Sequence, residues 1–503
     1  MNKLITLLKK LDDNLIKILF IGFIFIAPLY PKLPIRMINY TYIAIRFEDL
    51  YIVILGIVFL IQLVRKKITL NKHFFILFIL FWVACFLSFL WGAYIQKTVI
   101  YPHLGFLHAL RRIEYMSVFF VGLSLIKSKS DFFFYLKIIF AVLFIVLVYG
   151  VGQKFLGWPA VQTMNPEYAK GYLLILTPEA RVSSTFAGHY DLAAYLIFLM
   201  PILLGFYFFK KQLVYFLLFI FSIFMLVLTS SRVSYGAYIV SIFAFLLFFR
   251  KFKYTAVILI ITALFTFSSD NLTSRISRTF QIKQLYVNQQ TGQVVVPQKI
   301  TIKELPAGTS YIQIKDKKQK TQQEIKKEQF LVREKLLDDI RWEASRSGKT
   351  LSKLEEEQLL ASISASLKPI NTIVSDISFA TRLSAEWPRA IKAFLYNPIL
   401  GLGPSSITEA TDNDYLRWLG EFGLLGTLLF LLILYSILKT VFKYAKTQQD
   451  NKKIFYFGFL FGLFALLINA TYIDVFEASK VAFQFWITSG IFIGLVLIKD
   501  NNA

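Results

Sequence analysis

Residues 212–229 read QLVYFLLFIFSIFMLVLT, an unbroken apolar run that ends at a short polar turn and leads into a second run at 232–249. Such a run approaches the ~20 residues that a helix needs to cross the roughly 30 Å hydrocarbon layer of a membrane. Similar runs recur along the chain of 503 residues, of which 56% are hydrophobic and only 17% are charged. A soluble domain usually carries about a quarter charged residues, so this composition excludes an ordinary soluble protein. We expect an all-α polytopic membrane protein.

Twelve segments are predicted to span the membrane, at 15–30, 49–64, 74–93, 107–126, 133–152, 190–208, 212–229, 232–249, 253–267, 419–438, 454–473 and 481–498. Every second connection is rich in lysine and arginine. Because such connections stay on the cytoplasmic side of a membrane, we expect both termini to be cytoplasmic. The net charge of +24 therefore indicates topology and contact with anionic lipids, and no nucleic-acid partner is expected.

The predicted spans divide the chain into helices one to nine at 1–267, a large extracytoplasmic loop at 268–418, and helices ten to twelve at 419–503. The loop is too long to be structureless. Within it, residues of about 281–375 are interpreted as a small inserted α+β region, with strands in 284–314 and helices from about 321 to 367.

Ionisable side chains gather at the predicted outer ends of the spans, where charge is costly and often functional. A planar arginine fork binds phosphate through two parallel hydrogen bonds, whereas lysine acts as a point charge. The pattern therefore predicts an outward cavity for an anionic ligand that bears pyrophosphate. A single arginine beside a membrane is also typical of a snorkelling anchor, and this alternative stays open for each arginine taken alone. The candidates are Arg111, Arg112, Arg181, His189, Asp191, Arg232, Arg382, Arg389, Asp412, Asn413 and Glu421.

The sequence offers no pattern for a metal or redox centre. His103, His108 and His189 are too scattered to suggest a metal site, and the single cysteine, Cys85, cannot form an intrachain disulfide. We expect neither a metal ion nor another cofactor.

One motif resembles a known family. Asp412-Asn413, nine further residues and then Gly423-Leu-Leu-Gly426 are similar to the signature of the O-antigen ligase / O-antigen polymerase superfamily, in which the first position is a histidine. The blocks Arg181–His189, Thr229–Arg232 and Asn397–Gly403 agree with this family. The resemblance covers most of the chain outside about 281–375, and that region looks like an insertion.

The resemblance implies a membrane glycosyltransferase that transfers or polymerises a glycan from an undecaprenyl-pyrophosphate carrier onto an acceptor hydroxyl. It implies a place in the bacterial cytoplasmic (inner) membrane with the catalytic face outside. The expected partners are the carrier-linked glycan donor, a glycan or lipid-glycan acceptor, and membrane lipids.

The resemblance also implies roles for particular residues. In the ligases of this family the motif histidine is thought to activate the acceptor, and arginines bind the pyrophosphate. Here Asp412 stands at the histidine position with Asn413 beside it, and a carboxylate can also serve as a general base. Arg181 and Arg232 are expected to contact the pyrophosphate, with Arg111 or Arg112 assisting.

Several alternatives remain open from the sequence. The motifs do not separate a polymerase of repeat units from a ligase with an unusual acceptor. The rival classes are a transporter of a small anion or a lipid-linked glycan, and a non-catalytic component of a glycan-export assembly. Transporters often contain inverted repeats and helices that are broken within the membrane, and the sequence suggests neither feature here.

Overall fold

The computed structural model describes residues 2–39, 41, 44–163, 168–177, 180–277, 280–288, 294–295, 313–314, 330, 333–334, 336–338, 340–341, 344, 352–365, 367–375, 382–407 and 411–500. The chain divides into two compact units. Met1–Thr273 and Arg389–Ala503 form the first, which we call the membrane unit, and Ser274–Pro388 form the second, which we call the insert unit.

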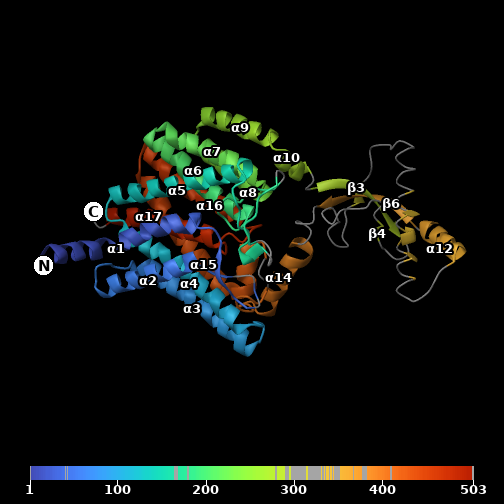
Figure 1. Ribbon diagram of the computed structural model, residues 1–503, viewed down its shortest axis with the longest axis horizontal. Helices are drawn as coiled ribbons and strands as arrows, with labels where there is room; N and C mark the ends of the chain where they lie inside the picture. The colour runs from blue at the N-terminus through green and yellow to red at the C-terminus, as the bar shows by residue number, and fades with distance from the viewer. Residues whose placement is uncertain are drawn as a thin grey trace. The chain divides into compact units, whose positions relative to one another are not determined.

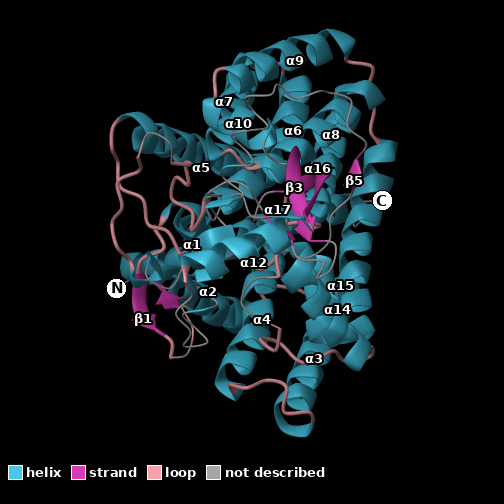
Figure 2. Ribbon diagram, turned by 90° about the vertical axis from the view of Figure 1, so that its right-hand side faces the viewer, coloured by secondary structure: helices cyan, strands magenta, loops and turns pink. Residues whose placement is uncertain are grey.

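The membrane unit is built from long apolar helices (Figures 1 and 2). In chain order they are α1 (Asn2–Leu29), α2 (Phe47–Val64), α3 (Lys72–Leu90), α4 (Pro102–Leu125), α5 (Lys129–Phe155), α6 (His189–Lys210), α7 (Leu213–Thr229), α8 (Arg232–Phe248), α9 (Phe252–Phe267), α14 (Trp387–Tyr396), α15 (Asp414–Thr447), α16 (Asp450–Asn469) and α17 (Ser479–Asp500). A short hairpin of β1 (Pro34–Met37) and β2 (Ala44–Arg46) precedes α2, a π-helical turn at Trp91–Ile95 follows α3, a 3₁₀ turn η2 covers Tyr168–Lys170, and α10 (Asp270–Ser277) follows α9.

Seven helices among the described residues are long and apolar enough to cross a membrane, namely α2, α3 with its π-helical turn, α5, α6, α15, α16 and α17. Four other apolar helices are shorter, at 14–29, 213–229, 232–248 and 252–267. Helix α4 is long, but Arg111, Arg112 and Glu114 interrupt its apolar run. The polytopic all-α membrane fold is therefore confirmed, while the number of twelve spans stays a prediction.

The core of the membrane unit forms around α6 and α17, whose side chains are almost all buried. Glycines allow close contact between backbones at both helices. Gly458 of α16 lies against the backbone of Pro201 in α6, and Gly490 of α17 lies against the backbone of Phe119 in α4. Close approach at small residues is how membrane helices gain packing energy without a hydrophobic driving force. Helix α9 lies at the margin (Figure 2) and packs mainly against α7 and α8, with Tyr254 in contact with Tyr207 and Phe208 of α6.

Helix α15 is interrupted at Gly423, which has φ 62° and ψ −164°. The loop 398–403 occupies the interruption. The N–H groups of Leu424 and Leu425 donate into this loop at 2.7 and 3.1 Å, and N–H groups of the loop donate to the carbonyls of residues 420 and 421 at 2.9 and 3.0 Å. The expectation that no helix is broken is therefore wrong. Gly423 adopts a backbone conformation that other residues rarely adopt, and the loop supplies the hydrogen bonds that the helix loses.

The insert unit contains a four-stranded sheet with the order β4-β3-β6-β5. The strands β3 (Phe280–Asn288) and β6 (Leu367–Ser375) pair antiparallel along their whole length, from Phe280↔Ser375 to Asn288↔Leu367. β4 (Val294–Val295) and β5 (Gln313–Ile314) lie within the region predicted to form strands, and α12 (Lys353–Ala365) lies within the region predicted to be helical. Residues 300–302 and 321–329, where a strand and part of a helix were expected, lie outside the described residues. A π-helical turn, η4, covers Arg382–Glu386.

Candidate functional site

A polar cavity of about 270 Å³ opens at one end of the membrane unit. We call this the loop end, because described residues of the loops at 31–39, 44–46, 156–163, 180–188, 411–413 and 470–478 line the cavity. The cavity brings together Arg111, Asp191 and Asp412, which the sequence analysis had named from three distant segments. Its other basic, acidic or histidine lining residues are Lys32, Arg46, His108, Arg417, Asp474 and Glu477.

Asp412 lies in a loop held by the carboxylate of Asp474. That carboxylate accepts hydrogen bonds from the backbone N–H groups of Thr411, Asp412 and Asn413 at 3.1, 3.2 and 2.9 Å. It also lies 2.9 Å from the guanidinium of Arg417. Hydrogen bonds to a charged group are stronger than neutral ones. Asp474 therefore fixes the loop that presents Asp412, whose φ of 52° is in the left-handed region.

A second carboxylate, at the start of α15, bonds in the reverse direction to the backbone of the turn at 471–476. Asp414 accepts hydrogen bonds from the backbone N–H groups of Val475 and Phe476 at 2.8 and 3.2 Å. The start of α15 and the turn at 471–476 thus exchange carboxylate-to-backbone bonds in both directions.

The residue that caps α15 is Asn413. Its side-chain oxygen accepts a hydrogen bond from the N–H of Leu416 at 3.0 Å, and its amide donates to the carbonyl of Thr471 at 2.9 Å. Asn413 thereby fulfils the N-cap role that asparagine commonly has. The cap of this helix does not require Asp412.

A network of buried ion pairs joins α4, α15 and the 471–478 turn, and two of its members, Arg417 and Glu477, line the polar cavity. Arg417 lies 3.5 Å from Glu421, one helical turn away in α15, and Arg112 of α4 lies 3.7 Å from the same carboxylate. Arg112 also pairs with Glu477. Since breaking a buried pair leaves an uncompensated charge at a cost of about 3–5 kcal/mol, these residues hold α4, α15 and the 471–478 turn in fixed relation. Arg112 and Glu421, both predicted site residues, belong to this network and do not line the cavity.

Two buried lysines fix the segment between α1 and β1. Lys480 donates to the backbone carbonyls of Pro28, Tyr30 and Thr185 at 2.9, 2.6 and 2.6 Å. Lys32 lies 2.6 Å from Glu48 and also donates to Ser479. Burial lowers the pKa of Lys32 from its ordinary value, while the neighbouring carboxylate of Glu48 acts to raise it.

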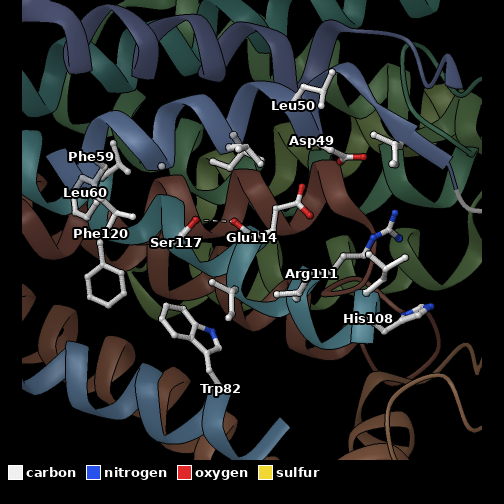
Figure 3. Close-up of a pocket in the computed structure, with 18 of the residues that line it drawn as sticks. Asp49, Leu50, Phe59, Leu60, Trp82, His108, Arg111, Glu114, Ser117 and Phe120 are labelled. Carbon is white, nitrogen blue, oxygen red and sulfur yellow. Dashed lines mark hydrogen bonds between the residues drawn. The ribbon is translucent and has the colours of Figure 1, made fainter. Parts of the chain in front are cut away.

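An apolar cavity of about 570 Å³ lies beside the polar one, between α2, α3 and α4. Figure 3 shows Phe59, Leu60 and Phe120 toward one end of this cavity and Asp49, Arg111 and His108 toward the other. The cavity is therefore amphipathic along its length.

Arg181 and Arg232 are not among the residues that line the polar cavity. Arg181 lies 2.5 Å from Nε2 of His189, and its guanidinium stacks 5.7 Å from the ring centre of Tyr190, which does line the cavity. Arg232 begins α8, directly after Ser231, whose hydroxyl is 2.8 Å from that of Ser234.

Two further predicted candidates lie elsewhere. Arg389 is exposed on α14 in the membrane unit, and Arg382 belongs to the insert unit. The structure does not bring either residue to the polar cavity.

The comparison with protein families agrees with this geometry. Residues 217–431 match a family model described as O-Antigen ligase. This match supports the resemblance of the chain to the O-antigen ligase/polymerase superfamily. The matched residues cover a little less than half of the chain, and a search of curated proteins finds no match. The predicted resemblance is confirmed.

The O-antigen ligase match contains Arg232, Asp412 and Gly423, and it ends before the 471–478 turn. In general terms, this superfamily comprises membrane glycosyltransferases of ligase or polymerase type that use lipid-linked glycan donors and glycan acceptors. The match therefore supports a role in polysaccharide biosynthesis at a membrane.

Sequence reasoning did not select four residues that line the polar cavity: Lys32, Arg417, Asp474 and Glu477. His108 was noted only as one of several scattered histidines. A further lining residue, Arg46, stands in a polar segment before α2 and can be read from the sequence as a membrane anchor. A signal existed for Asp474, which follows α16 in a short polar turn between two apolar spans.

Proposed function

We propose that the chain transfers or polymerises a glycan from an undecaprenyl-pyrophosphate carrier onto an acceptor hydroxyl. The observation that carries this proposal is the polar cavity in which Arg111, Asp191 and Asp412 meet, next to an apolar cavity of about 570 Å³. A lipid-linked sugar needs both environments, because its tail is apolar and its pyrophosphate and sugar are polar.

The reaction is a displacement at the anomeric carbon of the donor sugar. The acceptor oxygen forms a bond to this carbon and loses its proton to Asp412. The bond between the carbon and the pyrophosphate oxygen breaks, and the electron pair leaves with the pyrophosphate. Fixed positive charge stabilises the negative charge that grows on the leaving group, and in this proposal Arg181, Arg232 and Arg111 supply it.

Asp412 acts as the base in this proposal, and Asn413 keeps the loop in place. The backbone bonds to Asp474 support the assignment, because they orient the loop without using the side chain of Asp412. Arg112 has a supporting role, since its guanidinium pairs with Glu477 and Glu421.

The proposal includes a location. The chain lies in the bacterial cytoplasmic membrane with both termini in the cytoplasm, and the loop end faces outward. The charge pattern of the connecting segments supports this orientation.

Asp412→Asn tests the chemistry. The full chain is reconstituted with a lipid-linked oligosaccharide, and release of undecaprenyl pyrophosphate and product size are followed. An amide has no proton affinity near neutral pH, so we expect transfer to fall by ~10²-fold or more while donor binding persists. Asp412→His is expected to keep part of the activity. Full activity of Asp412→Asn would reject the assigned base and shift it to Asp191 or Asp414.

A further inference from the structure

Helix α14 is held against the membrane unit by one narrow face. Residues 389–396 of this helix belong to the membrane unit. Ala390 and Ala393 are buried, and both lie against Gly420 in the first half of α15 (Figure 2). Most of the other side chains from 389 to 396 are exposed. One side of α14 is therefore fixed by protein contacts, and the rest of its surface faces away from the membrane unit.

This exposed surface is divided into an apolar flank and a basic flank. Ile391 and Leu395 are four positions apart, so they form one flank, and they are 44% and 67% exposed. Arg389 and Lys392 are three positions apart and form the other flank, and both are exposed. An apolar flank beside a basic one is typical of a helix that lies in the plane of a membrane interface.

The apolar flank continues into the surface of α15 that faces lipid. Ile399, which follows α14, is 68% exposed, and its carbonyl accepts a hydrogen bond from the N–H of Leu425 at 3.1 Å. Leu424, Leu425 and Leu428 are exposed as well. Since α15 is long and apolar enough to cross a membrane, these leucines lie in the hydrocarbon layer. The end of α14 therefore adjoins acyl chains.

Aromatic side chains mark the edge of the hydrocarbon layer at the same place. Trp91 and Tyr94 are exposed in the π-helical turn that follows α3, and Gly92 of this turn packs against the backbone of Leu402 in the loop after α14. Tyr396, the last residue of α14, is also exposed. Tryptophan and tyrosine concentrate at the boundary between membrane and water. Helix α14 thus lies at the depth of this boundary.

We propose that α14 is an interfacial helix that lies lengthwise in the membrane leaflet at the loop end. Ile391 and Leu395 lie among acyl chains, and Arg389 and Lys392 contact the phosphates of anionic lipid headgroups. The basic flank favours anionic lipid, because positive side chains are attracted to a negatively charged membrane surface. This contact gives Arg389 a role that the polar cavity does not explain.

Nitroxide labels test the depth of α14. The full chain carries Leu395→Cys in a Cys85→Ser background and is reconstituted in vesicles of phosphatidylcholine and phosphatidylglycerol. Relaxation of the label by oxygen, which concentrates among acyl chains, is compared with relaxation by a water-soluble nickel complex. We expect the label at residue 395 to favour oxygen, because this side chain lies among acyl chains.

Two further positions calibrate the measurement. Leu428→Cys places the label on the exposed surface of α15, and Gln449→Cys places it in the exposed connection between α15 and α16. We expect the label at residue 395 to resemble that at 428 and to differ from that at 449. The opposite result overturns the proposal. Shielding of residue 395 from both reagents also overturns it, because a second copy or another part of the chain would then cover the flank.

The basic flank is tested with the same label at residue 395. Arg389→Gln and Lys392→Gln are combined and compared with the pair Lys439→Gln and Lys443→Gln, which removes two exposed lysines near the other end of α15. Each basic side chain beside an anionic surface strengthens membrane binding roughly fivefold. We therefore expect the first pair to increase access of the nickel complex to the label, and the control pair to leave it unchanged.

The lipid composition provides the last arm of the test. Omission of phosphatidylglycerol from the vesicles should increase access of the nickel complex to residue 395 in the parent protein, as loss of Arg389 and Lys392 does. Equal access with and without these two side chains, in vesicles that contain phosphatidylglycerol, overturns the assigned headgroup contact. None of these measurements requires glycan transfer, so they decide the role of α14 independently of the proposed function.

Discussion

Arg111 and Arg112 are adjacent in the sequence but serve different parts of the molecule. Successive residues of a helix point about 100° apart, because 3.6 residues complete a turn. Arg111 faces both cavities, while Arg112 faces α15 and the 471–478 turn, where Glu421 and Glu477 pair with it. The partners of Arg112 come from residues more than 300 positions away in the sequence. A local pattern identifies charged residues that need partners, and only the fold decides which partners they receive.

Asp474 offers a residue-scale test of how the Asp412 loop is positioned. In Asp474→Asn, one of the two oxygens that accept from the backbone is replaced by an NH2 donor, and the charge that pairs with Arg417 is lost. We expect a lower thermal stability and a loss of transfer on the order of 10²-fold, since small displacements of a catalytic group have effects of this size. Donor binding should change little, so the loss should fall on kcat.

The control for this variant is Asp450→Asn, which removes an exposed carboxylate at the start of α16. It is expected to leave stability and transfer as they are. Wild-type kcat in Asp474→Asn would show that the Asp412 loop keeps its position without this charge.

Arg181 and Arg232 provide a second residue-scale prediction. If they contact the carrier pyrophosphate, alanine at either position removes a charge-assisted hydrogen bond worth roughly 1.5–3 kcal/mol, and donor affinity falls accordingly. Lysine should restore only part of the affinity, because it keeps the charge without the fork. The measurement is binding of undecaprenyl pyrophosphate in detergent. If both alanine variants bind and turn over normally at normal protein levels, neither arginine contacts the donor.

At the scale of elements, the interruption in α15 explains why the motif that begins at Asp412 has a glycine at position 423. Gly423 has a positive φ, and a side chain there would meet the backbone of Ile399. The interruption resembles the broken helices of transporters, but here the groups it releases at residues 420, 421, 424 and 425 are all hydrogen-bonded to the loop 398–403. The interruption is therefore filled by protein backbone, and the first half of α15 carries Asn413 to the rim of the polar cavity.

Gly423→Ala tests this element. The added methyl group conflicts with both the backbone conformation and the 398–403 loop, so we expect a loss of stability well above the ~1 kcal/mol that ordinary substitutions cause. Gly236→Ala, in the interior of α8 with open space around it, should be neutral or slightly stabilising, because alanine favours helix more than glycine does. Thermal unfolding in detergent measures both. Equal melting temperatures for the two variants would contradict the role assigned to Gly423.

At the scale of the whole molecule, the sequence predicted the features that depend on local composition. Each predicted span coincides with an observed helix apart from a few residues at its ends, because long apolar runs leave few alternatives in a membrane. The motif around Asp412 was also accessible, since its residues lie within fifteen positions of one another. The walls of the polar cavity were not accessible, because Lys32, Arg46, His108 and Asp474 come from segments that only meet once the helices pack.

The orientation of the molecule in the membrane is the last prediction and belongs to this scale. The lysine-rich connections, including the one between α15 and α16, are expected in the cytoplasm, so the insert unit and the loop end must both lie outside. Single cysteines are introduced into a Cys85→Ser background, since Cys85 is the only native cysteine. Phe330→Cys and Lys446→Cys report on the two sides, because both positions are exposed. An impermeant maleimide should label residue 330 in intact spheroplasts and residue 446 only after the membrane is permeabilised. The reverse pattern would place the Asp412 loop in the cytoplasm, where a carrier-linked glycan displayed on the outer face cannot reach it, and the proposed reaction would fail together with the orientation.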